Sequence, residues 1–144
     1  LRVITYVLDT KAMGLKIWLT LIKNEPWKIS VFTDSDYAGD PVTRRSVSGY
    51  VIYVHNVPVC WRSKAQWSVT LSSTEAEWVA LSEAVKEVIF LMQLCNSMII
   101  KIQLPVEVRV DNVGAIFMSK NVTTTSQTKH VDIRSKYICT PNIQ

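Results

Sequence analysis

Apolar residues in the first half of the chain gather in short runs separated by polar loops and turns, which is the pattern of strands rather than helices. These runs cover residues 29–34, 50–54 and 57–61, and they are rich in β-branched or aromatic side chains. The pair His55-Asn56 separates the last two runs, so we expect a two-residue hairpin turn there. The pattern therefore predicts three antiparallel strands.

Between residues 73 and 98 the apolar residues recur at three- and four-residue steps, which predicts a long helix with one buried face. That face comprises Trp78, Leu81, Val85, Val88, Met92 and Cys95. Ser72, followed by Glu75, has the form of a capping box at the start of this helix. A further strand at residues 106–110 and a short helix near Asn112 come next. This order of elements indicates a mixed α/β fold.

Composition changes this picture little. A length of 144 residues is enough for one domain with a buried core. The net charge of +4 is weak evidence for a polyanionic partner such as nucleic acid. The most apolar stretch, residues 88–100, contains polar residues and is too short to cross a bilayer, so we expect no membrane span.

Two aspartates lie at the ends of predicted strands. Asp34 ends the first strand, and Asp111 ends the later one just before a helix. Active sites of open α/β sheets gather at such strand ends. Surface turns also use aspartates, so position alone leaves a turn-forming role open for both residues.

Glu77 is the third candidate acidic residue. Helical steps place it in line with Leu81 and Val88, on the side of the helix that faces the sheet. The glutamates expected to point toward solvent are Glu75, Glu83 and Glu87. A carboxylate on the core side needs either a cationic partner or a metal ion. An ion pair with a lysine or arginine and a metal site therefore both remain open at this point.

These three carboxylates, from two strand ends and one helix start, would converge on one point. Hard oxygen ligands of this kind suit Mg²⁺ or Mn²⁺ rather than Zn²⁺. Two such ions would activate a water molecule and stabilise the leaving oxygen of a phosphodiester, so no side-chain nucleophile is needed. The chain accordingly has no convincing Ser–His–Asp or Cys–His arrangement.

The chain resembles the ribonuclease H domain of Ty1/copia-type retrotransposon polyproteins in four segments that follow the family's order: FTDSDYAGDPVTRRSVSGYVIYV, VCWRSKAQWSVTLSSTEAEWVALSEAVKE, VRVDNVGAIFMSKN and TKHVDIRSKYI. The resemblance implies a ribonuclease H-like α/β fold, with a mixed central sheet of three antiparallel strands and then a parallel strand, flanked by helices. It also implies an endonuclease that hydrolyses the RNA strand of RNA–DNA hybrids during reverse transcription, using carboxylate-held Mg²⁺. By position, Asp34, Glu77 and Asp111 match the family's catalytic and metal-binding acidic residues.

The opening segment RVITYVLDTKAMGLKIWL resembles the connector between reverse transcriptase and ribonuclease H in such polyproteins. Within it, the spacing of apolar residues 3–8 predicts a short amphipathic helix. We therefore expect residues 1–27 to connect from a reverse transcriptase domain of the same polyprotein. Residues 28–144 are expected to form a ribonuclease H-like domain that lacks its C-terminal strand and helix. The family context implies a virus-like particle in the cytoplasm.

Two departures from the family pattern leave the activity open. The family's fourth acidic ligand lies in a late segment of the form Ala-Asp-x-Leu-Thr-Lys, which this sequence does not contain. Asp132 is the only late aspartate and is the weaker candidate for that metal ligand. Gln127 stands where the family commonly has a basic residue. The alternative hypothesis is therefore a catalytically inactive remnant, which binds nucleic acid or packs against a reverse transcriptase.

A hybrid duplex is expected to be held mainly through phosphates and RNA 2′-hydroxyls, because sequence-independent cleavage needs no base readout. The candidates are Arg44, Arg45 and Lys64 for phosphates, Ser73, Thr74 and Asn112 for the RNA strand, and Lys129 and His130 as further substrate-binding residues. Solvated surface or helix capping is the competing explanation for each. Trp61 and Trp78 fit the core pattern, so we expect both to pack inside, whereas the pattern does not decide Trp67.

Overall fold

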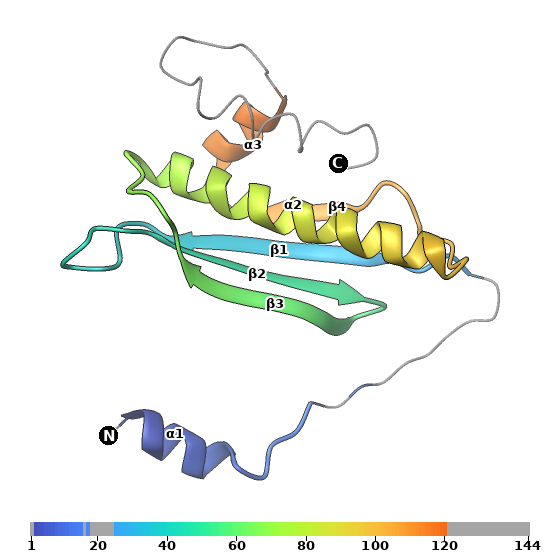
Figure 1. The fold of residues 1–144 in the computed structure, drawn as a ribbon, viewed down its shortest axis with the longest axis horizontal. Helices are drawn as coiled ribbons and strands as arrows, with labels where there is room; N and C mark the ends of the chain where they lie inside the picture. The colour runs from blue at the N-terminus through green and yellow to red at the C-terminus, as the bar shows by residue number, and fades with distance from the viewer. Residues whose placement is uncertain (1, 16, 18–24, 121–144) are drawn as a thin grey trace.

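The computed structural model describes residues 2–15, 17 and 25–120, and its elements follow the predicted order (Figure 1). In chain order they are α1 (Arg2–Thr10), β1 (Ile29–Asp36), β2 (Val47–Val54), β3 (Val57–Ala65), α2 (Ser73–Ser97), β4 (Glu107–Val110) and α3 (Val113–Lys120). The described strands form one sheet in the order β3-β2-β1-β4. Both β1–β2 and β2–β3 are antiparallel, whereas β4 runs parallel to β1. The predicted mixed sheet is confirmed.

Helix α2 lies across one face of the sheet, and the hydrophobic core fills the space between them (Figure 1). The buried residues of this core are Ile29, Val31, Tyr50, Ile52, Val54, Ala84, Val88 and Val106. A second cluster of Trp78, Leu81 and Val85 lies in the first half of the helix. Side chains of β2 alternate strictly between buried and half-buried, as expected for a strand with only one face against a core.

The start of α2 is capped as the sequence predicts. The Ser72 hydroxyl accepts a hydrogen bond from the Glu75 N–H over 3.1 Å. In return, the Glu75 carboxylate accepts from the Leu71 N–H over 2.7 Å, one residue before the usual partner. None of the helices in the described part of the chain has the length and apolar composition of a membrane span.

The predicted hairpin turn is confirmed at His55 and Asn56, whose positive φ angles of 47° and 66° suit a tight two-residue turn. The two strands beside it are longer than predicted, because polar residues continue their pairing: Gly49 pairs with Ser63 and Ser48 with Lys64. Gln66, just after β3, is buried, and its Nε2 donates to the Ser48 hydroxyl over 2.9 Å and to the Ala76 carbonyl over 3.0 Å. Hydrogen bonds thus replace apolar contacts at this end of the sheet.

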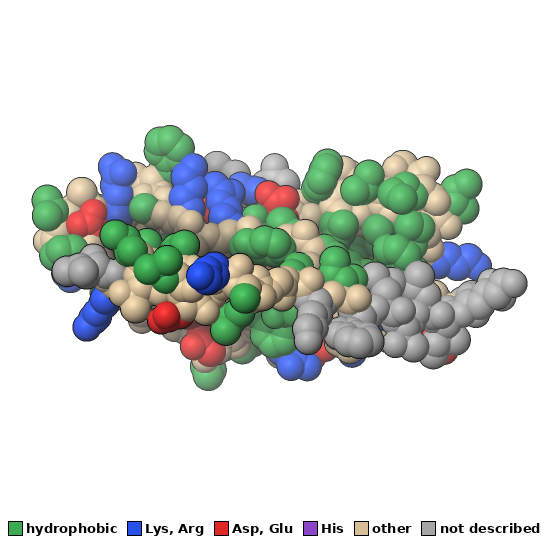
Figure 2. Space-filling model, turned by 90° about the horizontal axis from the view of Figure 1, so that it is seen from below, with side chains coloured by type: hydrophobic (Ala, Val, Ile, Leu, Met, Phe, Trp, Pro, Cys, Tyr) green, Lys and Arg blue, Asp and Glu red, His purple; other side chains and the backbone are tan. Residues whose placement is uncertain are grey.

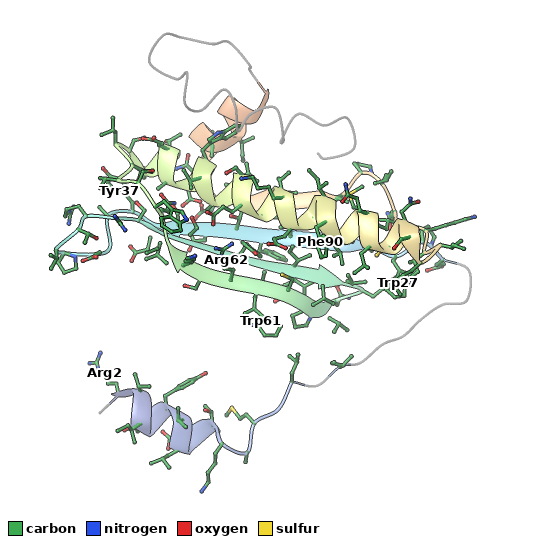
Figure 3. All side chains as sticks on the ribbon, in the orientation of Figure 1. Arg2, Trp27, Tyr37, Trp61, Arg62 and Phe90 are labelled. Atoms are coloured by element: carbon green, nitrogen blue, oxygen red, sulfur yellow. The ribbon has the colours of Figure 1, made fainter. Side chains whose placement is uncertain are left out.

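The expectation that Trp61 packs in the core is wrong, since its side chain is 63% exposed and points away from α2 (Figure 3). A bulge is the cause. Ile52 pairs with Cys60 but Tyr53 pairs with Pro58, so β3 contains one extra residue at this point. The extra residue reverses the alternation between Val57 and Trp61, which places Trp61 on the face opposite the core. Trp78 is 1% exposed, as predicted.

Candidate active site

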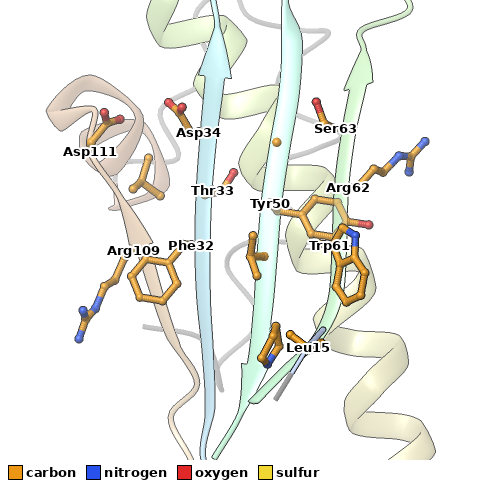
Figure 4. Close-up of a pocket in the computed structure, with 14 residues that line it drawn as sticks. Leu15, Phe32, Thr33, Asp34, Tyr50, Trp61, Arg62, Ser63, Arg109 and Asp111 are labelled. Carbon is orange, nitrogen blue, oxygen red and sulfur yellow. The ribbon is translucent and has the colours of Figure 1, made fainter. Parts of the chain in front are cut away.

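Three carboxylates converge at one edge of the sheet. Asp34 lies near the end of β1, Asp111 directly follows β4, and Glu77 lies in the first turns of α2. Because Thr33 pairs with Val110 in the parallel β1–β4 ladder, the two aspartates leave neighbouring strands at the same level (Figure 4). One carboxylate oxygen from each of the three residues lies within 4.8 Å of the other two. The predicted convergence is therefore present in the structure.

Glu77 is the buried member of this cluster, with 5% of its surface exposed. Its Oε1 accepts two hydrogen bonds from Ser35, one from the backbone N–H over 2.9 Å and one from the hydroxyl over 2.7 Å. Its Oε2 is buried and has no hydrogen-bond partner among the described residues. One oxygen is thus fixed, and the other is left without compensation.

The pKa of Glu77 also indicates a carboxylate whose negative charge is not compensated. Burial raises the pKa of its carboxyl group, the two hydrogen bonds from Ser35 oppose the rise, and the negative charges of Asp111 and Asp34 add to it. In the described part of the chain, no lysine or arginine forms an ion pair with any of the three carboxylates. The ion-pair explanation for Glu77 is therefore not supported by these residues.

The cluster is compatible with divalent cations. Its donors are all carboxylate oxygens, which are the ligands that Mg²⁺ and Mn²⁺ prefer. A cation would also compensate the unpartnered Oε2 of Glu77 and the repulsion among three negative charges. The side chains present therefore fit such an ion.

Thr74 and Asn112 join the two helices beside the acidic cluster. The Thr74 hydroxyl lies 3.5 Å from Asn112 Oδ1, and the same oxygen accepts from the Ala115 N–H over 3.0 Å. Asn112 thus caps the start of α3, as the competing explanation for it proposed. Gly114 permits this close approach, because a Cβ atom there would lie 2.8 Å from the Thr74 hydroxyl oxygen.

The other predicted substrate-binding residues in the described part of the chain are exposed. Arg44 and Arg45 are exposed in the loop between β1 and β2. Lys64 is exposed on β3, where its Nζ lies 5.3 Å from the centroid of the Trp67 ring. Ser73 is exposed at the first position of α2. Gln127, Lys129, His130 and Asp132 lie outside the described residues.

A groove of about 820 Å³ adjoins the acidic cluster on the sheet face opposite α2. Asp34 and Asp111 lie at one end of it, and Phe32 and Trp61 line its apolar middle (Figure 4). The sequence pattern predicts neither this groove nor the role of Ser35. Neither has a local signal, because each depends on which residues the strand register brings together.

The hydroxyl of Ser35 is predicted to tune cation binding through Glu77. In Ser35→Ala the backbone N–H still donates to Glu77, but the hydroxyl bond is lost, so the carboxylate is less firmly oriented. We expect affinity for Mn²⁺, measured by isothermal titration calorimetry, to fall by about 10–100-fold, as is usual when a partner of a metal ligand is removed. Ser63→Ala, on the exposed part of β3, is the matched control. Equal affinities for Ser35→Ala and the native chain would contradict this role.

No protein-family model matches the chain. The retrovirus-related Pol polyprotein from transposon RE1 of Arabidopsis thaliana is 31% identical over 137 residues, which are 95% of this chain and 9% of that protein. The Pol polyprotein from transposon TNT 1-94 of Nicotiana tabacum is 38% identical over 107 residues, which are 74% of this chain and 8% of that protein. The chain thus spans less than a tenth of the length of these relatives.

Among solved structures, LC11-RNase H1, isolated from compost by a metagenomic approach, matches with a TM-score of 0.58 and 21% sequence identity. The match covers 81% of this chain and 80% of that one, and it supports the fold. The chain therefore has a ribonuclease H-like fold, and over most of its length its sequence is similar to a part of the Pol polyproteins of these transposons.

Proposed function

We propose that this chain is the ribonuclease H domain of a retrotransposon polyprotein, an endonuclease that hydrolyses the RNA strand of RNA–DNA hybrids during reverse transcription. The observation that carries the proposal is the convergence of Asp34, Glu77 and Asp111, with the buried Oε2 of Glu77 lacking a partner. The ribonuclease H-like fold and the Pol polyprotein relatives support it.

In this proposal the three carboxylates hold the metal. Two Mg²⁺ or Mn²⁺ ions, when bound, would supply an activated water molecule and stabilise the leaving oxygen of the phosphodiester. Asp34 and Asp111 are exposed, so they leave room for a phosphodiester to approach, whereas Glu77 is buried and held by Ser35. Asp132 is retained as the weaker candidate for a fourth ligand.

Substrate contacts in the proposal surround this cluster. The proposed contacts are Ser73, Thr74 and Asn112 for the RNA strand, Arg44, Arg45 and Lys64 for phosphates, and Lys129 and His130 as further substrate-binding residues. Residues 1–27 are proposed as the connector from the reverse transcriptase domain of the same polyprotein, and residues 28–144 as the ribonuclease H-like domain. The proposed setting is a virus-like particle in the cytoplasm.

The test is a cleavage assay with a labelled RNA–DNA hybrid, matched DNA and RNA duplexes, and Mg²⁺ or Mn²⁺. We expect cleavage of the RNA strand in the hybrid only, and we expect Asp34→Asn to reduce cleavage to the level seen without a cation, because a metal ligand is lost. If the folded chain cuts no hybrid even with Mn²⁺, the enzymatic proposal fails for this chain. The inactive remnant then becomes the leading explanation.

A further inference from the structure

The sheet face opposite α2 carries an apolar surface that no described helix covers. The strand register places Phe32, Val51 and Trp61 side by side across β1, β2 and β3 on this face. Phe32 and Trp61 are 41% and 63% exposed, and both line the groove that ends at the acidic cluster (Figure 4). The next row along the same face holds Asp34, Gly49 and Ser63. An apolar strip therefore lies directly beside the carboxylates.

Helix α1 carries an apolar surface that is equally uncovered. Val3, Ile4, Val7 and Leu8 lie on one side of this helix, and each is more than half exposed. The helix has nine residues, none of them buried. Isolated helices of fewer than about 12–15 residues are marginal in water, so a helix of this length needs a packing partner. The view from the α1 side shows the hydrophobic side chains exposed on this face of the molecule (Figure 2).

The chain already brings these two surfaces together at one point. Leu15, five residues after the end of α1, lines the groove together with Phe32 and Trp61 (Figure 4). We propose that α1 docks on the open sheet face of its own chain, with Val7 and Leu8 covering the strip formed by Phe32, Val51 and Trp61. The tether through Leu15 keeps the helix at high effective concentration near the groove.

The lining of the groove favours this helix over nucleic acid. The groove is lined mainly by apolar side chains, whereas a phosphate backbone requires cations. Of the two arginines that line it, Arg109 donates to Glu107 over 2.9 Å and stands above the Phe32 ring, 5.2 Å from its centroid. Because Leu15 of the same chain already lines the groove, the tethered helix is favoured over a helix from a second copy.

Hydrogen exchange of the intact chain, followed by mass spectrometry, tests the docking. In the native chain we expect the α1 amides to exchange at least about tenfold more slowly than in a peptide of residues 1–13. Leu8→Glu is expected to remove this protection, whereas Thr5→Glu, on another side of α1, is expected to keep it. Trp61→Glu should remove the protection from the sheet side, whereas Trp67→Glu, outside the groove, should keep it.

Unchanged exchange in α2 verifies that each variant is folded. If docking is correct, combining Leu8→Glu with Trp61→Glu adds nothing to either change alone, because both remove the same contact.

Fast exchange of α1 in the native chain would overturn the proposal, and so would protection that survives Trp61→Glu. Protection that grows with protein concentration would assign the groove to a second copy. Protection that appears only with added hybrid would assign it to nucleic acid. Cleavage activity does not enter the readout, so the result is independent of the nuclease proposal.

Discussion

The Glu77→Gln variant is expected to be more stable than the native chain when no divalent cation is present, and to lose the stabilisation that Mn²⁺ adds. A glutamine keeps an oxygen that accepts from Ser35, and it removes the charge that Asp34 and Asp111 repel. Its amide nitrogen would take the place of Oε2, which now has no partner in the described structure, and could donate to the nearby carboxylates of Asp34 and Asp111. We expect a gain of about 1–3 kcal/mol in the free energy of unfolding, the usual cost of a buried unsatisfied polar group.

The pH dependence of this gain follows from the direction of the pKa shift. The pKa of Glu77 in the folded state is raised above its ordinary value of 4.5, so the folded state binds the proton more tightly than the unfolded state. Protonation therefore favours folding, fully so below about pH 4.5, and this contribution is lost as the pH rises through the raised pKa. The stability difference between Glu77→Gln and the native chain should thus be largest at neutral pH and shrink toward pH 4.5.

Thermal melts of both proteins between pH 4.5 and 7.5, with EDTA or with Mn²⁺, measure these effects. Glu83→Gln is the matched control, because Glu83 lies half-buried on the same helix and outside the acidic cluster. A cation at 100 times its dissociation constant adds about 2.7 kcal/mol to the native chain. Equal responses of Glu77→Gln and the native chain to Mn²⁺ would argue against Glu77 as a ligand.

Trp78→Ala is expected to cost about 3–5 kcal/mol in the free energy of unfolding, the largest effect on stability that we predict. Its side chain is 1% exposed and packs with Leu81 and Val85 between α2 and the sheet, so truncation leaves a cavity. Chemical denaturation measures the loss. Trp67→Ala is the matched control, since Trp67 is 80% exposed, and we expect it to cost less than about 0.5 kcal/mol. Similar losses for the two variants would mean that Trp78 is not an anchor of the core.

The two variants also separate what local pattern can decide from what it cannot. The helical steps of α2 identified Trp78 as a core residue, because every residue of a regular helix keeps its angular position. The alternation in β3 placed Trp61 in the core as well, and this was wrong, because the bulge adds one residue between Val57 and Trp61. A single extra residue reverses the face of a strand but is not visible in its composition.

The acidic site, too, is predicted in part by local sequence pattern and in part decided by tertiary structure. The β-rich runs before Asp34 and Asp111 indicate these two residues, and helical periodicity separates Glu77, on the side facing the sheet, from Glu75. The parallel pairing of β1 with β4, which brings the two aspartates to one level, follows from tertiary structure. The two hydrogen bonds from Ser35 to Glu77 are also tertiary, since 42 residues separate the two side chains along the chain.

The sequence by itself therefore determines the features that depend on a few neighbouring residues. These are the turn at His55 and Asn56, the cap at Ser72 and the buried face of α2. These depend on backbone angles, on a hydrogen bond between near neighbours and on helical periodicity. Only the tertiary structure decided three other features. These are the full length of β2 and β3, the exposure of Trp61 on the face opposite the core, and the hydrogen bonds from Ser35 to Glu77. Each of them depends either on strand register or on a buried polar contact between distant segments. The order of neighbouring residues encodes neither the register nor such contacts.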